Sequence, residues 1–153
     1  MAKIVKIKIT SINFKRFDKT LPPPEFKTKG AVAADVSSRV DLDFAPGEIK
    51  LVPLNVAMEI PEGYCMFLIS RSSTYKLGIR SVNGIGVFDN DFCGDNDEFH
   101  FIAQNFTDHP VHLEKGMRIA QILLIKKENF SLKEVDNLGH HPTRGGIGST
   151  GVK

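Results

Sequence analysis

This sequence has little of three things: cysteine, excess charge and long apolar runs. It holds two cysteines in 153 residues, and no apolar stretch opens its N-terminus as a secretory signal would. Such a chain is expected to keep its thiols reduced, in a cytoplasmic setting. Its net charge of +2 is smaller than the basic surplus of a dedicated nucleic-acid binder. We therefore expect no nucleic acid as partner. No apolar run reaches transmembrane length, so we expect no membrane as partner either.

The sequence also lacks the spacings of a metal centre and of a nucleophile triad. His100, His109 and His112 have no cysteine partners at zinc spacing, and the pair His140-His141 has no ligand spacing of its own. We therefore expect no metal bound directly by the protein.

What the sequence does have is strands and turns. Hydrophobic residues make up 41% of it, enough for one domain with a core. One short helix is predicted over 72–77, with Ser72 as its N-cap and Gly78 as its stop. Strand patterns cover 3–9, 33–36, 49–60, 64–70, 79–82, 85–88, 99–105, 111–113 and 119–125.

Many short strands predict an all-β fold, an antiparallel sandwich, barrel or jelly roll. Segments 79–82 and 85–88 are predicted to form a hairpin around Gly84. Residues 119–125 are nearly all aliphatic, as in a buried strand. The chain turns polar from Lys126 on, so we divide it into a β body over 1–126 and a flexible C-terminal arm over 127–153.

The arm ends in a glycine-rich stretch that includes Arg144, Gly148, Ser149 and Thr150. Glycines let backbone N–H groups turn toward an anion, and arginine and hydroxyl groups donate to phosphate oxygens. The stretch suits a clasp for a polyphosphate. It is not a Walker loop, because no lysine precedes Ser149. Composition alone favours a disordered Gly/Ser tail instead.

Segment 83–95 is the richest in polar groups among glycines. Asn83 can read a base edge with its amide, and the ring of Phe92 offers a face to a sugar or base. Asp89 follows the apolar pair Val87-Phe88 at a strand end, where a half-buried carboxylate can act as a general base. The alternative is an Asx-rich tight turn.

Arg71, Ser72 and Ser73 lie at the predicted helix start, where free N–H groups favour an anion. A plain N-cap with a surface arginine explains them equally well. Gln121 interrupts the aliphatic strand and needs a hydrogen-bond partner. Asp35 is the single carboxylate of the small-residue strand 33–36.

Together these segments resemble the five ordered motifs of the trimeric dUTPases, the deoxyuridine triphosphate nucleotidohydrolases. Residues 33–36 resemble the first motif, 71–73 the second, 83–94 the third, 118–121 the fourth and the arm the fifth. They follow the family's order and span nearly the whole chain.

The resemblance implies a jelly-roll homotrimer with three active sites, each shared by three subunits. It implies hydrolysis of dUTP to dUMP and pyrophosphate by water attack on the α-phosphorus, which limits uracil in DNA and supplies dUMP. Mg²⁺ would arrive on the triphosphate, with Asp35 at most touching its water shell.

The resemblance also implies which residue contacts which part of the nucleotide. Asp89 would activate the water, and Phe92 would pack on the deoxyribose. The uracil would be read by Asn83 and the backbone of Gly86, Val87 and Phe88, and covered by Ile147. Arg71, Ser72, Ser73 and Gln121 would contact the α- and β-phosphates. Arg144, Ser149 and Thr150 would close on the γ-phosphate, and Gly148 would contact the substrate.

The chain departs from the family pattern in three places. Phe92 stands where a tyrosine is usual, which removes one hydroxyl. Ile147 stands where an aromatic residue is usual. Residues 95–97 resemble a short insertion after the third motif.

Two rival functions stay open. A dCTP deaminase shares the fold, but its chemistry needs a glutamate facing the base, and Glu98 lies one residue from the expected spacing and should point away. A nucleotide-sensing regulatory module without turnover is the second rival. Asp89 argues against it, and Ile147 argues mildly for it.

Overall fold

The computed structural model describes residues 11–139, 142–143 and 145–146. Their regular structure is strand, with one four-residue 3-10 helix, so the all-β prediction is confirmed. The elements are β1 (Phe14–Lys15), β2 (Ala34–Ser37), β3 (Leu42–Phe44), β4 (Ile49–Pro53), β5 (Ala57–Met58), β6 (Tyr64–Ser70), η1 (Thr74–Leu77), β7 (Ile79–Ser81), β8 (Ile85–Phe88), β9 (His100–Asn105), β10 (Val111–Leu113) and β11 (Arg118–Lys126). The strand predicted over 3–9 lies outside the described residues.

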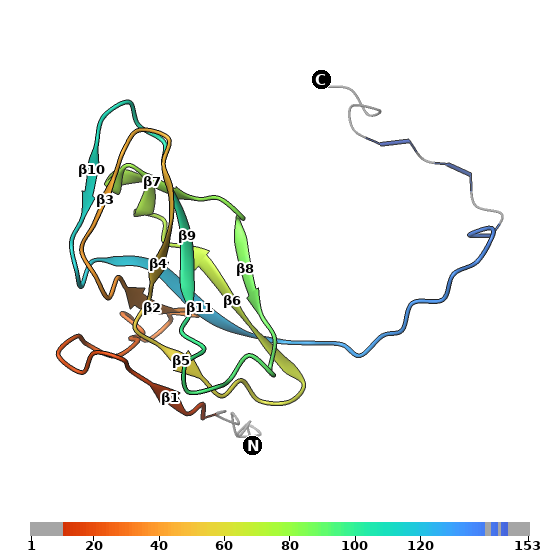
Figure 1. The fold of residues 1–153 in the computed structure, drawn as a ribbon. Helices are drawn as coiled ribbons and strands as arrows, with labels where there is room; N and C mark the ends of the chain where they lie inside the picture. The colour runs from red at the N-terminus through yellow and green to blue at the C-terminus, as the bar shows by residue number, and fades with distance from the viewer. Residues whose placement is uncertain (1–10, 140–141, 144, 147–153) are drawn as a thin grey trace, which may run out of the picture.

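The strands form antiparallel sheets around one core, in a jelly-roll-like arrangement (Figure 1). The largest sheet has the order β2-β11-β6-β8, and a second has the order β4-β9-β7. Two pairs, β1-β5 and β10-β3, complete the body. No helix among the described residues is long and apolar enough to cross a membrane.

The core is built by the alternation of side chains along the strands. In β9, Phe101 and Ala103 are buried while His100 is exposed, the period-two pattern of a strand with one solvated face. β11 is less buried than its composition predicts, because Leu123, Leu124 and Ile125 are only half-buried.

The hairpin predicted around Gly84 is wrong. β7 pairs with β9, and β8 pairs with β6, so the two arms belong to different sheets. Val82 N–H donates to Ile102 O at 3.0 Å, which continues the ladder with β9 up to the turn. Gly84 then turns with a φ of 70° and sends the chain to the other sheet. A sheet-crossing turn and a hairpin turn both need a glycine at positive φ, so the local sequence does not separate them.

The helix is shorter than predicted, and its start is different. Ser73 flanks it without a side-chain hydrogen bond, so the Ser72 cap is wrong. Thr74 closes the turn instead: its hydroxyl accepts from Arg71 N–H at 2.9 Å and donates to Ile119 O at 2.7 Å. The predicted stop is confirmed, because Gly78 has a φ of 77° and its N–H bonds to Tyr75 O.

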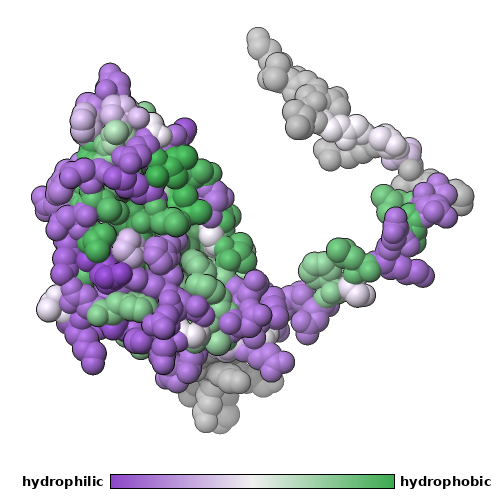
Figure 2. Space-filling view, viewed as in Figure 1, coloured by the Kyte–Doolittle hydropathy of each residue, from purple (hydrophilic) through white to green (hydrophobic). Residues whose placement is uncertain are grey.

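After β11 the chain leaves the body (Figure 1). Lys127 N–H donates to Gly63 O at 2.9 Å, and every residue described beyond it is exposed. Apolar side chains gather along this stretch (Figure 2): Phe130, Leu132 and Leu138 are each more than 80% exposed, at 82%, 91% and 93%. The division into a body and an arm at residue 126 stays a prediction.

Candidate functional site

A cluster of charged and amide side chains lies across three neighbouring strands. Asp35 on β2 is opposite Gln121 on β11, and Gln121 is opposite Ile69 on β6. Arg71 follows β6 directly, and Arg118 begins β11. The strand order β2-β11-β6 therefore brings together parts of the first, second and fourth motifs that lie far apart in the sequence.

The carboxylate of Asp35 organises this cluster. Its side chain is 10% exposed, and its Oδ2 accepts from Arg71 Nε at 3.0 Å and from Arg118 Nη1 at 2.9 Å. Arg71 Nη1 also donates to Arg118 O at 3.0 Å. Two guanidinium groups share one carboxylate, so the cluster keeps a net positive charge and holds both arginines in fixed positions. Two arginines held in this way have the charge and the donors that suit an anion.

The cluster lines two cavities. The first, of about 270 Å³, is lined by Lys27, Thr28, Ala31, Ala33, Asp35, Arg71, Ser72, Arg118 and Gln121. The second, of about 320 Å³, is lined by Arg71, Ser73, Lys76, Leu77, Met117 and Arg118. Arg71 and Arg118 border both, so the two hollows adjoin.

The structure thus brings together Asp35, Arg71, Ser72 and Gln121, and it places Ser73 on the adjoining hollow. The hydrogen-bond partner expected for Gln121 is a backbone carbonyl: the Gln121 Nε2 donates to Ser70 O at 3.2 Å. Sequence reasoning missed Arg118 as a member of the anion site. The available signal was its place in the fourth motif, three residues before Gln121 in a strand.

The third motif lies at the open edge of the same sheet. β8 pairs with β6, and its other edge carries no strand among the described residues. Gly86 lies close against Leu68, where an added Cβ would meet Leu68 Cβ at 3.3 Å. Ile85 and Val87 are exposed on the surface, at 51% and 57%. On the edge of β8 that faces away from β6, backbone groups have no strand partner among the described residues, so they can meet a planar ligand.

Asn83 and Asp89 stand at the two ends of β8. The Asn83 side chain is exposed, and its Oδ1 accepts from Ser81 Oγ at 3.0 Å. Asp89 was expected to be half-buried, but it is exposed in the single chain. It follows the last residue of β8 at the rim of the sheet, and the described part of the chain leaves it open to solvent.

One chain does not bring Asp89 to the arginine cluster. Phe88 is opposite Met66 on β6, so Asp89 lies level with the start of that strand, near Cys65. Arg71 lies beyond the other end of β6. Arg71 is six positions after Cys65, and a strand rises about 3.3 Å per residue, so the gap is about 20 Å. Within one chain, Asp89 and Arg71 therefore lie near opposite ends of β6.

The predicted phosphate clasp lies mostly outside the described residues. Arg144, Ile147, Gly148, Ser149 and Thr150 are among the residues that the structure does not describe. Gly145, which is described, has a φ of 91°, a conformation suited to glycine.

Within the part of the chain that the structure describes, the donor side chains do not form a site for a metal bound by the protein. Across residues 11–139 and the other described positions, no three His, Cys, Asp or Glu side chains come together. Asp35 is the carboxylate of the first cavity, and its Oδ2 already accepts from two arginines. A cation that arrives on a polyphosphate fits this site better than one held by a carboxylate cage.

Comparison with known proteins identifies the family. A family model described as dUTPase matches residues 19–151. The chain belongs to the dUTPase family. It is 46% identical over 121 residues to the SPbeta prophage-derived deoxyuridine 5'-triphosphate nucleotidohydrolase YosS of Bacillus subtilis, with 78% of this chain and 83% of that protein covered. It is 36% identical over 143 residues to the Dictyoglomus turgidum dUTPase, with 90% and 95% covered.

Solved dUTPase structures share the fold. A mutant dUTPase of Staphylococcus bacteriophage 80alpha, solved with dUpNHpp, matches with a TM-score of 0.81 and 25% identity, and the match covers 94% of this chain and 100% of that one. The Streptococcus mutans dUTPase matches with a TM-score of 0.70 and 26% identity, covering 77% and 98%. The dUTPase family expectation from the five motifs is confirmed.

Proposed function

We propose that this chain is a dUTP diphosphatase, which hydrolyses dUTP to dUMP and pyrophosphate by water attack on the α-phosphorus. The observation that carries the proposal is the cavity in which Asp35, Arg71, Ser72 and Gln121 meet. These residues come from three motifs of the dUTPase family, and their charge suits a polyphosphate. In the cell this reaction limits uracil in DNA and supplies dUMP, and we place it in the cytoplasm.

The phosphates are held by side chains of known position and by the arm. Arg71, Ser72, Ser73 and Gln121 bind the α- and β-phosphates, where Asp35 keeps the Arg71 guanidinium in place. Arg144, Gly148, Ser149 and Thr150 close on the γ-phosphate. Because phosphoryl transfer depends mainly on positioning and charge stabilisation, fixed arginines lower the barrier without covalent chemistry.

The nucleoside is read at the edge of β8. The Asn83 amide and the backbone groups of Gly86, Val87 and Phe88 bind uracil, which needs a donor and acceptor pattern that a strand edge supplies. Phe92 packs on the deoxyribose and leaves no room for a ribose hydroxyl. Ile147 covers the base with apolar surface.

Asp89 is the general base that orients and activates the attacking water. Its distance of about 20 Å from Arg71 along the sheet supports a site shared between chains. We propose a homotrimer in which one chain supplies Asp35, Arg71 and Gln121, a second supplies the third motif, and a third supplies the arm.

Mg²⁺ belongs to this reaction as part of the substrate. It is carried by the triphosphate, whose charge it lowers, and Asp35 touches at most its water shell.

Pyrophosphate release tests the proposal. The purified protein is incubated with dUTP, dCTP, dTTP or UTP, and both pyrophosphate and ammonia are measured. Pyrophosphate from dUTP alone supports the assignment. Ammonia from dCTP would support the deaminase, and binding without either product would support the sensing module. The deaminase is not favoured, because Glu98 is 7% exposed and bound to Arg39 and Asn55 N–H.

A further inference from the structure

Three phenylalanine rings meet where the third motif leaves β8. Phe88 and Phe99 stack with their centroids 3.9 Å apart and their planes 4° from parallel. The ring of Phe92 lies 5.6 Å from Phe88 and 6.2 Å from Phe99. Phe99 is fully buried and Phe92 is 36% exposed, so the cluster reaches from the core to the surface.

Phe99 is the fixed member of this cluster. Its N–H donates to Val56 O at 2.8 Å, and its carbonyl accepts from Leu54 N–H at 2.9 Å. The preceding residue, Glu98, is held by Arg39 through two hydrogen bonds of 2.8 and 2.9 Å. The backbone of Phe99 and the side chain of Glu98 are therefore both held by hydrogen bonds. The ring of Phe99 cannot shift without disturbing the core.

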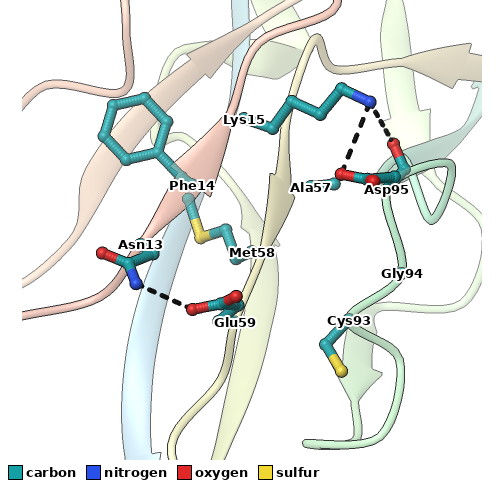
Figure 3. Close-up of a pocket in the computed structure, with 9 residues that line it drawn as sticks. All are labelled: Asn13, Phe14, Lys15, Ala57, Met58, Glu59, Cys93, Gly94 and Asp95. Carbon is teal, nitrogen blue, oxygen red and sulfur yellow. Dashed lines mark hydrogen bonds and ion pairs between the residues drawn. The ribbon is translucent and has the colours of Figure 1, made fainter.

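Residues 95–97, which resemble an insertion, lie in the loop between Phe92 and Phe99. Asp97 Oδ2 accepts from Gly94 N–H at 2.7 Å, and the Asp97 N–H donates to Gly94 O at 3.0 Å. Lys15 on β1 donates to Asp95 O at 2.8 Å (Figure 3). These hydrogen bonds hold the loop between the two rings as a compact turn.

The ring of Phe92 has no polar atom, so its orientation depends on packing against its neighbours. A tyrosine at this place would add a hydroxyl that could be held by a hydrogen bond. Phenylalanine has only its faces and edges, and among the described residues its aromatic neighbours are Phe88 and Phe99. Stacked or tilted ring pairs favour particular orientations beyond the gain from burial.

We propose that Phe99, together with Phe88, is a positioning residue that holds Phe92 as a rigid wall and so sets the selection of 2'-deoxyribose over ribose. The inference rests on the proposed function, in which Phe92 packs on the sugar. Exclusion of one hydroxyl by shape requires a wall that does not yield. A ring free to rotate would let the ribose hydroxyl enter, while uracil reading by the β8 backbone would stay unchanged.

The test compares Phe99→Leu with a matched control, Phe101→Leu. Phe101 is also a buried phenylalanine, at 2% exposure, two residues further along the chain, and it is outside the ring cluster. Both changes remove a ring from the core and keep an aliphatic side chain, so their costs in stability are similar. Thermal melting verifies that both variants fold.

Two ratios are measured in wild type and variants: kcat/KM for dUTP against UTP, and the equilibrium affinity for non-hydrolysable imido analogues of dUTP and UTP. Phe99→Leu is expected to lower both ratios about tenfold, the scale of discrimination by shape in a pocket. Phe101→Leu is expected to leave them unchanged, and the ratio of dUTP to dCTP is expected to stay constant in both.

Equal ratios in Phe99→Leu and wild type, or equal losses in the two variants, would overturn the proposal. If Phe99→Leu does not fold, Phe88→Leu takes its place, since Phe88 is only half-buried and its loss costs less. Failure of wild type to hydrolyse dUTP would overturn the proposed function. The binding ratio would then still decide whether the rings select the sugar.

Discussion

Asp35 and Arg71 form an ion pair that joins two sequence motifs at the edge of a cavity. Arg71 Nε lies 3.0 Å from Asp35 Oδ2, and both side chains are largely buried, at 24% and 10% exposure. The same oxygen accepts from Arg118. One carboxylate thus holds two guanidinium groups side by side. Without its negative charge, the two positive charges would repel each other.

Asp35→Asn is therefore expected to damage both stability and turnover. Loss of the charge leaves two partly buried arginines facing each other, which we expect to cost about 1–2 kcal/mol, less than for a fully buried pair because Arg118 is 41% exposed. kcat/KM for dUTP should fall roughly tenfold or more as Arg71 loses its position. Thermal unfolding and pyrophosphate release measure the two effects.

The control for Asp35 is Asp108→Asn, which removes a fully exposed carboxylate far from the cluster in sequence. It should leave kcat/KM unchanged and change stability little, because its ion-pair partner His109 is itself 69% exposed. An Asp35→Asn protein with wild-type activity would mean that Arg71 does not need its partner.

Asp89→Asn is expected to abolish turnover and to keep nucleotide binding largely intact. Loss of a general base costs on the order of 100- to 10,000-fold in rate. Single-turnover hydrolysis of dUTP and binding of a non-hydrolysable analogue separate the two quantities. Near-wild-type hydrolysis would remove Asp89 from the mechanism.

Mixed trimers test whether active sites are shared. One inactive variant carries Asp89→Asn, and the other is truncated after Thr143 and so lacks the clasp. Some sites in a mixed trimer combine an intact Asp89 with an intact arm, so part of the activity should return on subunit exchange. No recovery despite confirmed exchange would argue against shared sites, and a monomer in sedimentation would end the trimer proposal.

Ile147→Phe is expected to raise kcat/KM for dUTP. An aromatic ring on a base contributes roughly 1–3 kcal/mol, and isoleucine keeps only the apolar part of that contact. If closure of the arm assembles the transition state, the gain appears in kcat/KM. Preference for dUTP over dCTP should not change, because stacking tolerates any base. An unchanged or lower kcat/KM would mean that Ile147 does not cover the base or is already optimal.

The pair His112 and Asp43 makes stability depend on pH. His112 on β10 is directly opposite Asp43 on β3, and its Nδ1 lies 2.6 Å from Asp43 Oδ1. The hydrogen bond to Asp43, with the charges of Asp43, Asp41 and Glu114, raises the pKa of His112 above its ordinary value of 6.5. The folded state then binds the proton more tightly than the unfolded state does, so the stabilisation is complete below pH 6.5 and is lost as pH rises through the folded pKa.

His112→Gln should therefore lower the melting temperature more at about pH 5.5 than at about pH 8.5. The effect is small, because both side chains are more than half exposed, at 52% and 85%. Thermal melting of both proteins at the two pH values measures it. The same difference in melting temperature at both pH values would show that the pair carries no proton linkage.

The sequence by itself determined the class of fold, the five motifs in order and the single helix stop. β6 and β8 lie where alternation and apolar runs predict them, over 64–70 and 85–88. Gly78 ends the helix because its positive φ is incompatible with a further helical turn. Both features depend on neighbouring residues alone. Side chains alternate between the two faces of a strand, and glycine adopts a positive φ more easily than other residues. The family follows from the same local motifs, because each keeps its residue types and its order.

Only the tertiary structure decided which segments meet. The local sequence predicted a hairpin of 79–82 and 85–88. Instead the first strand pairs with β9 and the second with β6. Packing of two sheets on one core selects these partners, which lie elsewhere in the chain. The pairing of β2, β11 and β6 brings Asp35, Gln121 and Arg71 together, and the register of β6 with β8 carries Asp89 away from them. Distances of this kind depend on strand order and register, which long-range burial fixes and no single segment encodes.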